Sequence, residues 1–281
     1  MIAWLGRKNR GWLLLGYLLI TLFAIWAVIP FYWMLLTSFK SEGEILTPTA
    51  NILPQQFTLV HYTKTFFATG YPNFLKNSTV VALATTLLSV VVGSMAGYAI
   101  TRLRFRGRDT VARVLIYSYL VPASILFIPL FALMVSLKLN NSLFGLALSY
   151  LTFTVPFCTW MLIGYFRTVP IELEEAALVD GATKWTVLWR IIVPLSAPAM
   201  VVVAVFSFTL SWNEFLYALV LVQNKEYMTA PVGLTSFQVA DQTFWGAMMA
   251  ASTIMSLPPL VLYLVSQRWV IAGWTLGSVK G

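Results

Sequence analysis

The chain has little of what metal sites, disulfide frameworks and soluble enzymes are built from. Only 10% of its 281 residues are charged, and it contains one cysteine and one histidine, whereas a soluble domain carries about 25% charged residues. Cys158 has no second cysteine with which to form a disulfide or a metal framework. His61 has no second histidine, so we expect it in a loop or on the surface, and we expect no bound metal.

A nucleotide site is missing as well. The sequence has no Gly-x-x-x-x-Gly-Lys-[Ser/Thr] run, the loop whose backbone amides cradle phosphates. The chain therefore has no visible means of binding ATP itself. Its net charge of +8 would suit nucleic acid, but the placement of the basic residues argues against that partner.

Apolar sequence is what the chain has in abundance. Its composition is 59% hydrophobic and its mean hydropathy is +0.81. Long unbroken apolar runs indicate an all-α membrane protein, because a β-barrel would show short alternating segments. Residues 12–38 carry no charge. This run is longer than the core of a secretory signal and exceeds the about 20 residues that cross a bilayer, so we predict a retained first span.

The apolar runs predict six spans: residues 12–38, 77–100, 111–137, 143–166, 195–222 and 243–266. Gly93 and Gly97 in the second span form either a close helix contact or two incidental glycines. Pro122 and Pro129 should kink or break the third span, and Pro258 with Pro259 should kink the sixth. We divide the chain into residues 1–76, with the first span and an external loop, and a core of residues 77–281.

The basic residues set the orientation. With both termini in the cytoplasm, thirteen of the 18 Lys and Arg residues lie in cytoplasmic segments and five outside. The positive-inside rule favours this layout. The same bias explains the net charge without nucleic acid.

The polar stretch 172–194, between the fourth and fifth spans, predicts a helical hairpin. Pro170 suits a helix start. Gly181 can adopt the left-handed conformation that ends a helix, Thr183 can cap a second helix, and Pro194 can end or bend it. On shape alone the hairpin is either a plain connector or a docking element.

The residues Glu175-Ala176-Ala177, Gly181 and Ile191-Ile192-Val193-Pro194 resemble the cytoplasmic EAA loop of binding-protein-dependent ABC importer permeases. Val193 replaces the usual leucine, a mild apolar exchange. In that family the loop, here residues 167–194, forms a coupling helix in a cleft of the ATPase subunit. The resemblance implies ATPase coupling by Glu175, Ala176, Ala177, Asp180, Gly181, Ile191 and Pro194.

Further motifs resemble the carbohydrate importers of this family, of the maltose-transporter type. They are Trp212-Asn213-Glu214-Phe215, the basic turn Arg104-Phe105-Arg106-Gly107, and the tail ending in Gly277-Ser-Val-Lys280-Gly281. Trp274 and Leu276 depart from the commoner tail residues. The resemblance implies that the tail, residues 267–281, contacts the ATPase through Gly277, Lys280 and Gly281.

The family implies a type I ABC importer permease fold with six transmembrane helices in the cytoplasmic membrane of a bacterium or archaeon. It also implies a second homologous permease subunit, two ATPase subunits that hold ATP and Mg, and an extracytoplasmic sugar-binding protein. The chain itself would bind no cofactor and catalyse no reaction. No internal repeat supports a secondary transporter of the inverted-repeat kind.

Glu214 is the one acid deep in a predicted span, roughly 28 Å along the helix from Leu195 at 1.5 Å per residue. An intramembrane acid suggests function, so Trp212, Asn213, Glu214 and Tyr217 are candidate substrate-path residues. Glu214 could instead be structural, and the aromatic residues could form an interfacial belt.

The alternative to an importer subunit is an ATP-independent transporter or channel, which would not need the coupling loop. An intramembrane enzyme ranks third, because one glutamate makes no catalytic constellation.

Overall fold

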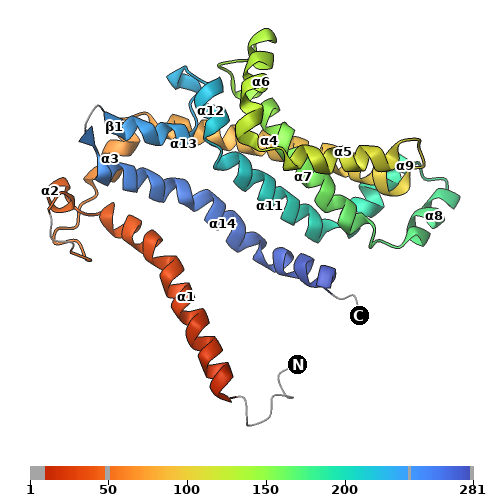
Figure 1. The fold of residues 1–281 in the computed structure, drawn as a ribbon, viewed down its shortest axis with the longest axis horizontal. Coiled ribbons are helices and arrows are strands. Elements are labelled where there is room, and N and C mark those ends of the chain that lie inside the picture. Colours follow the sequence, from red (N-terminus) through yellow and green to blue (C-terminus); the bar gives the residue numbers. More distant parts are fainter. Residues whose placement is uncertain (1–9, 48–50, 240–241, 279–281) are drawn as a thin grey trace. The chain divides into compact units, whose positions relative to one another are not determined.

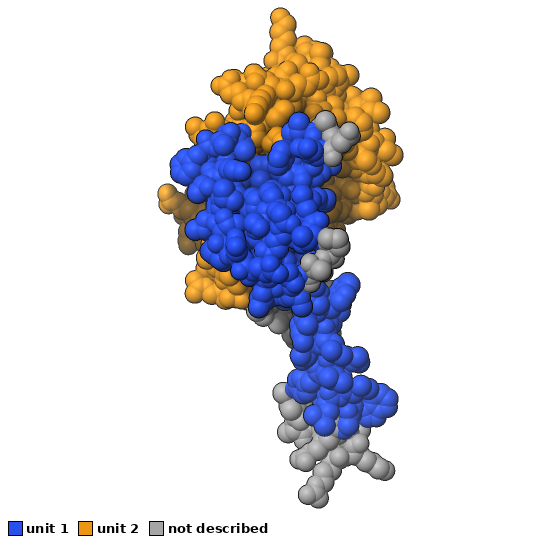
Figure 2. All heavy atoms as spheres, turned by 90° about the vertical axis from the view of Figure 1, so that its left-hand side faces the viewer, with its two compact units in different colours: residues 1–70, 237–254 blue, residues 71–236, 255–281 orange. Residues whose placement is uncertain are grey.

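The computed structural model describes residues 10–47, 51–239 and 242–278. The chain forms two compact units, shown in blue and orange in Figure 2. Unit 1 comprises Met1–Gly70 and Phe237–Ile254, and unit 2 comprises Tyr71–Ser236 and Met255–Gly281. The predicted all-α class is confirmed. Across the described residues, the strand content is one antiparallel pair, β1 (Gln238–Val239) and β2 (Gln242–Thr243), with Gln238 opposite Thr243.

Unit 1 contains the long helix α1 (Arg10–Thr37), two short helices, α2 (Glu42–Ile45) and α3 (Val60–Phe67), and the start of α14 (Trp245–Ser278) (Figure 1). None of the most apolar window of α1 is buried. A helix that is apolar on all sides and yet exposed is typical of a membrane span. The prediction of a spanning segment near the N-terminus is therefore consistent with α1.

Unit 2 holds most of the helices. In chain order they are α4 (Tyr71–Arg102), α5 (Arg108–Leu120), α6 (Ala123–Ser136), α7 (Leu143–Phe166), α8 (Ile171–Val179), α9 (Lys184–Val187), α10 (Val193–Leu195), α11 (Ala197–Trp212), α12 (Leu216–Leu221) and α13 (Ala230–Gly233). A π-helical turn, Leu188–Ile192, joins α9 to α10, and short 3₁₀ turns occupy Lys225–Tyr227 and Leu234–Phe237.

The core of unit 2 is built on α4 and α7. A Cβ added to Gly97 would lie 3.4 Å from the Cβ of Leu162, and Gly93 faces Cys158 still more closely. Between the same helices, the hydroxyls of Ser89 and Thr154 share a buried hydrogen bond of 2.6 Å. The glycine pair is therefore a close helix contact.

Within the described residues, four helices are long and apolar enough to cross a membrane: α1, α4, α7 and α14. Two bent pairs could each form one further span. The α5–α6 pair bends by 101° at Pro122, and the segment Lys184–Leu195 bends by 84° against α11. The predicted break of the third span is confirmed at Pro122, while Pro129 lies inside α6. The count of six spans and the cytoplasmic termini stay predictions.

Several boundaries differ from the sequence prediction. The second span begins at Tyr71, ahead of the predicted residue 77. The fifth is interrupted between Trp212 and Leu216, so it is two helices. Helix α14 is one element that runs through Pro258 and Pro259 to Ser278, beyond the predicted start of the tail. Tertiary packing, which hydropathy does not report, sets these ends.

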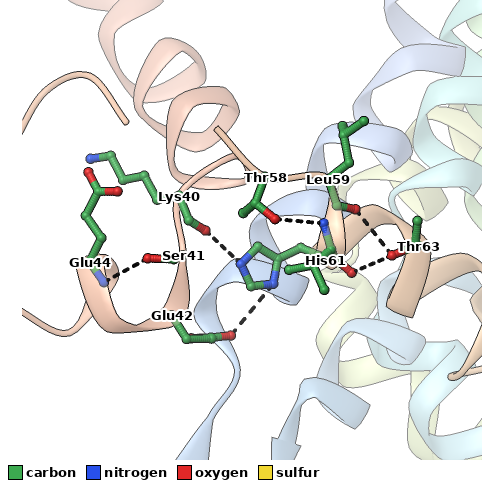
Figure 3. A network of polar contacts seen from close by, with 9 residues as sticks. Lys40, Ser41, Glu42, Glu44, Thr58, Leu59, His61 and Thr63 are labelled. Carbon is green, nitrogen blue, oxygen red and sulfur yellow. Dashed lines mark hydrogen bonds and ion pairs between the residues drawn. The ribbon is translucent and has the colours of Figure 1, made fainter. Parts of the chain in front are cut away.

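The expectation for His61 is wrong, because the residue is only 1% exposed. The Nε2 atom of His61 lies 2.8 Å from the Lys40 carbonyl oxygen, and Nδ1 lies 3.8 Å from a Glu42 carboxylate oxygen (Figure 3). Gly246, at the start of α14, packs directly on the ring. These contacts allow a polar ring to be buried, since its hydrogen bond is retained.

Candidate functional site

Helix α8 ends at Gly181 in a well-formed turn. Gly181 has φ +85°. Its N–H donates to the Leu178 carbonyl at 3.1 Å, and the N–H of Ala182 donates to the Ala177 carbonyl at 2.9 Å. This pair of bonds is the Schellman motif, in which a left-handed residue, usually glycine, closes a helix. The predicted left-handed glycine is confirmed.

The second arm of the hairpin begins as predicted. The Thr183 hydroxyl accepts a hydrogen bond of 3.2 Å from the N–H of Thr186 and so caps α9. The helix then widens into the π-helical turn, where the N–H of Val193 donates to the Leu188 carbonyl. Pro194 follows, and the chain bends at Ser196 into α11. Proline disturbs the hydrogen bonds of the preceding turn, which fits a bend at this place.

Most of the predicted coupling residues are exposed. Glu175, Ala176, Asp180, Gly181 and Pro194 are exposed, whereas Ala177 and Ile191 are half-buried and pack against the core of unit 2. One side of the hairpin is therefore attached to the chain, and the other is open.

Sequence reasoning missed two large apolar side chains that are exposed on this hairpin. Val179 is 88% exposed and Trp185 is 60% exposed. Large apolar side chains that are exposed on a polar loop suit a protein contact. The signal was available in the sequence, because both residues are bulky apolar side chains inside an otherwise polar loop.

Sequence reasoning also missed the special position of Glu174. Its side chain is buried, although its neighbours Leu173 and Glu175 are exposed. The Tyr98 hydroxyl donates a 2.6 Å hydrogen bond to Glu174 Oε1, and Arg102 Nε lies 3.5 Å from Oε2. Tyr98 and Arg102 stand four residues apart on α4, so they share a helix face. This spacing was the sequence signal for an acidic partner.

The Trp-Asn-Glu-Phe motif forms the break between α11 and α12. The Trp212 ring is buried and stacks on Phe208, with centroids 5.5 Å apart, while its Nε1 donates to the Met255 carbonyl at 3.0 Å. Asn213 is exposed, and its Nδ2 donates to the Thr209 carbonyl at 2.9 Å. These two side chains therefore bond within the chain at the end of α11.

Glu214 caps the next helix. Its two carboxylate oxygens accept from the N–H groups of Tyr217 and Ala218, at 2.9 and 3.1 Å. Carboxylates are favoured at the positive end of a helix. Tyr217 is buried and its hydroxyl donates to the Ala123 carbonyl at 3.1 Å. A role of these residues on a substrate path stays a prediction.

Two of the three predicted tail contacts lie outside the described residues. Gly277 lies within α14, while Lys280 and Gly281 are outside the described residues. Over the described part of the chain, no group of three or more His, Cys, Asp or Glu residues is placed to hold a metal ion.

Comparison with known proteins identifies the family. Residues 89–275 match the profile of the "binding-protein-dependent transport system inner membrane component" family. The permease protein YcjP of Escherichia coli K12, an inner membrane ABC transporter component, is 36% identical over 264 residues, covering 93% of this chain and 94% of that protein. The trehalose/maltose permease MalG of Thermococcus litoralis is 34% identical over 263 residues, covering 92% and 94%.

A further relative agrees with this assignment, and a solved structure has a similar fold. The diacetylchitobiose permease DasC of Streptomyces coelicolor is 34% identical over 254 residues, covering 90% of this chain and 92% of that protein. The fold resembles a chain of a bacterial ABC transporter that imports the polysaccharide alginate, with a TM-score of 0.80, 23% identity and coverage of 94% and 98%. In such importers the permease is a transport component, and ATP hydrolysis belongs to separate subunits. The chain is therefore a member of the binding-protein-dependent family of inner membrane components, and it is a multi-pass permease subunit of an ABC importer.

Proposed function

We propose that this permease carries a sugar or oligosaccharide across the cytoplasmic membrane of a bacterium or archaeon, delivered by an extracytoplasmic binding protein. Relatives named for trehalose/maltose, diacetylchitobiose and sulfoquinovosyl glycerol transport support the carbohydrate class. A solved alginate importer in complex with its periplasmic protein resembles this chain in fold, with a TM-score of 0.69. The binding protein would meet the predicted external segments.

The driving force comes from partners. Two ATPase subunits would hold ATP and Mg. The exposed face of the α8–α9 hairpin is the surface of this chain on which an ATPase subunit docks. The observation that carries this proposal is the two-sided character of the hairpin. Glu175, Ala176 and Asp180 are open to a partner, while Ala177 and Ile191 pack on the core. Small residues such as Ala176 allow close approach, and Glu175 can pair with a basic group of the partner.

A second homologous permease subunit would complete the path. Helices α5 and α6 carry exposed apolar side chains, among them Val114, Tyr117, Ile125 and Ile128. Lipid or a second permease covers such a surface in a membrane. The tail, with Gly277, Lys280 and Gly281, would reach the ATPase subunits.

The first test is to purify the tagged chain from its native membrane and identify the proteins that come with it. We expect an ATPase subunit, a second permease and a sugar-binding protein. Isolation of the chain alone, with substrate uptake that needs no ATP, would support the ATP-independent transporter instead.

The second test places the ATPase on the hairpin. Val179→Asp adds a charge to a side chain that is 88% exposed on α8. Phe67→Asp makes the same change on a side chain that is 89% exposed at the end of α3, in the predicted external loop. We expect the Val179 variant to lose the ATPase during purification and the Phe67 variant to retain it. Equal retention would remove the hairpin as the docking surface.

A further inference from the structure

We infer that Glu174 fastens α8 to α4, so that movement imposed on α8 is passed along α4 and is not absorbed by the hairpin. The inference rests on the proposed docking of the ATPase at α8. It concerns a positioning residue behind the docking face, because Glu174 points into the chain and away from any partner. Its contacts define what we call the Glu174 junction: Glu174, Tyr98 and Arg102.

Helix α8 is held to the rest of unit 2 by few of its side chains. Among the residues of α8, all of them described, Glu174 is the buried one. Ile171, Leu173 and Val179 of the same helix are exposed, and Ala177 and Leu178 are half-buried. The buried side chain of α8 is therefore a carboxylate and not an apolar side chain.

Both carboxylate oxygens of Glu174 face polar groups of α4. Oε1 of Glu174 accepts the directional hydrogen bond from Tyr98, and Oε2 faces Arg102 at 3.5 Å. The Glu174 and Arg102 side chains are 6% and 8% exposed. Arg102 Nη2 also donates to the Phe166 carbonyl at 2.9 Å and to the Val169 carbonyl. One arginine thus ties the end of α4 to the end of α7 and to the connection that leads into α8.

The energetics favour joint movement. A buried charge that loses its partner is left uncompensated in a medium of low dielectric constant, which is far costlier than separating an exposed pair. Separation of α8 from α4 would break the hydrogen bond from Tyr98 and the charge pair between Glu174 and Arg102. A force on α8 is therefore transmitted to the end of α4.

The other end of α4 is bonded to the segment at residues 226–230. At its other end, Asn77 Nδ2 donates to the carbonyls of Glu226 and Met228, at 2.8 and 2.9 Å. The next residue, Ser78, accepts a 2.8 Å hydrogen bond from the N–H of Ala230. Helix α4 is 32 residues long, and at 1.5 Å per residue it is about 48 Å long. It therefore connects the junction to the segment at residues 226–230, on the predicted external side.

The experiment measures whether ATP on one side changes the segment on the other. Glu226 is exposed, so Glu226→Cys provides a labelling site, and Cys158→Ala removes the native thiol. Right-side-out vesicles of the complete complex receive ATP and Mg inside and a membrane-impermeant biotin maleimide outside. With the junction intact, we expect ATP to change the labelling rate by about fivefold, within the usual range of coupling between sites.

Glu174→Gln should leave the ATPase bound and hydrolysing ATP while the ATP effect on labelling is lost. Asp109→Asn is the control, since Asp109 is an exposed carboxylate at the start of α5 and outside the hairpin, and it should behave as the parent protein. The amount of bound ATPase is measured separately from labelling. Loss of the ATPase from the parent complex would contradict the docking proposal, but it would not contradict the inference about the Glu174 junction.

Two further variants test the Glu174 junction in other ways. Tyr98→Phe removes the hydrogen bond but keeps the charge pair, and it should weaken the ATP effect even if Glu174→Gln fails to assemble. The double variant Tyr98→Cys with Glu174→Cys, joined by a short thiol-specific crosslinker, should restore the ATP effect that the uncrosslinked form lacks. An unchanged ATP effect in Tyr98→Phe and Glu174→Gln, or no recovery on crosslinking, would overturn the inference.

Discussion

A Cβ atom on Gly93 of α4 would lie 2.9 Å from the Cβ atom of Cys158 of α7 and 3.3 Å from the backbone nitrogen of Thr159. Real Cβ contacts are not this short, so the two helices pack at a distance that only glycine allows. The contact lies in the core of unit 2, within the helix pair that carries the Glu174 junction at its end. Helix spacing here therefore affects both stability and the position of α8.

Gly93→Ala should destabilise the permease by about 1–3 kcal/mol, the usual cost of overpacking a tight contact. Gly164→Ala is the control, because Gly164 lies in α7 and has nothing within 4 Å of the position of a Cβ. Alanine is the better helix former by about 1 kcal/mol, so this control should melt at or above the parent temperature. Thermal unfolding in detergent measures both, and equal melting temperatures would contradict the close contact.

Gly246→Ala should disturb unit 1, because the added Cβ would overlap the buried ring of His61. Displacing the ring would also break its hydrogen bond to the Lys40 carbonyl. Gly43→Ala serves as the control, since Gly43 lies in α2 with open space around it. Hydrogen exchange of α3 should rise in the Gly246 variant and stay unchanged in the control. Unchanged exchange in both would show that the ring can move aside without cost.

Glu214 allows a structural role and a transport role to be separated. Glutamine has one carbonyl oxygen, so Glu214→Gln can keep one of the two hydrogen bonds to the α12 backbone, whereas Glu214→Ala keeps neither. We expect Glu214→Ala to cost about 1 kcal/mol, as for other lost helix caps, and Glu214→Gln to cost less. Substrate uptake should change already in Glu214→Gln while the complex still assembles. If uptake instead follows the melting temperature in both variants, capping is the whole role of Glu214.

The hairpin shows what sequence can and cannot predict. The glycine turn and the Thr183 cap are local, since each depends on bonds within a few residues, and both were predicted correctly. The family resemblance also predicted the fold class, which is confirmed, whereas the docking face stays a prediction. Local patterns carry this information because one residue type, such as glycine at positive φ, meets one local demand.

Long-range relationships were beyond the same reasoning. The burial of His61 depends on Gly246, and the role of Glu174 depends on Tyr98 and Arg102, all distant in the sequence. Hydropathy likewise predicted one fifth span where the chain makes two helices at Glu214. An apolar run reports only that a segment is buried or lipid-facing, and it does not report the bonds that Asn213 and Glu214 make to the backbone at the break.

The topology of six spans can be tested directly. The positive-inside rule places the turn after α4 in the cytoplasm and the turn before α7 outside. A reporter enzyme fused after Arg108 should therefore read as cytoplasmic, and one fused at Ser142 as external. The reverse pattern would contradict the layout, because it would place the basic turn at Arg104 and Arg106 on the external side.

The turn at Gly181 is the most direct test of the coupling site. Gly181 has φ +85° and nothing within 4 Å of the position of a Cβ, so a substitution is opposed by backbone conformation and not by a clash. Gly181→Val should strain the turn by on the order of 1–2 kcal/mol, because a Cβ crowds the following carbonyl in the left-handed region. Relief of that strain would shift Glu175 and Ala176 away from their docked positions.

Gly181→Asn is the matched control, because asparagine tolerates the left-handed region better than other residues with a side chain. We expect the Val variant to insert in the membrane but to lose the ATPase, or to hydrolyse ATP without moving substrate. The Asn variant should retain much of the coupling. Co-purification of the ATPase and ATP-driven uptake in reconstituted vesicles measure both outcomes. Full uptake and full ATPase retention in Gly181→Val would show that the left-handed turn is not needed for coupling.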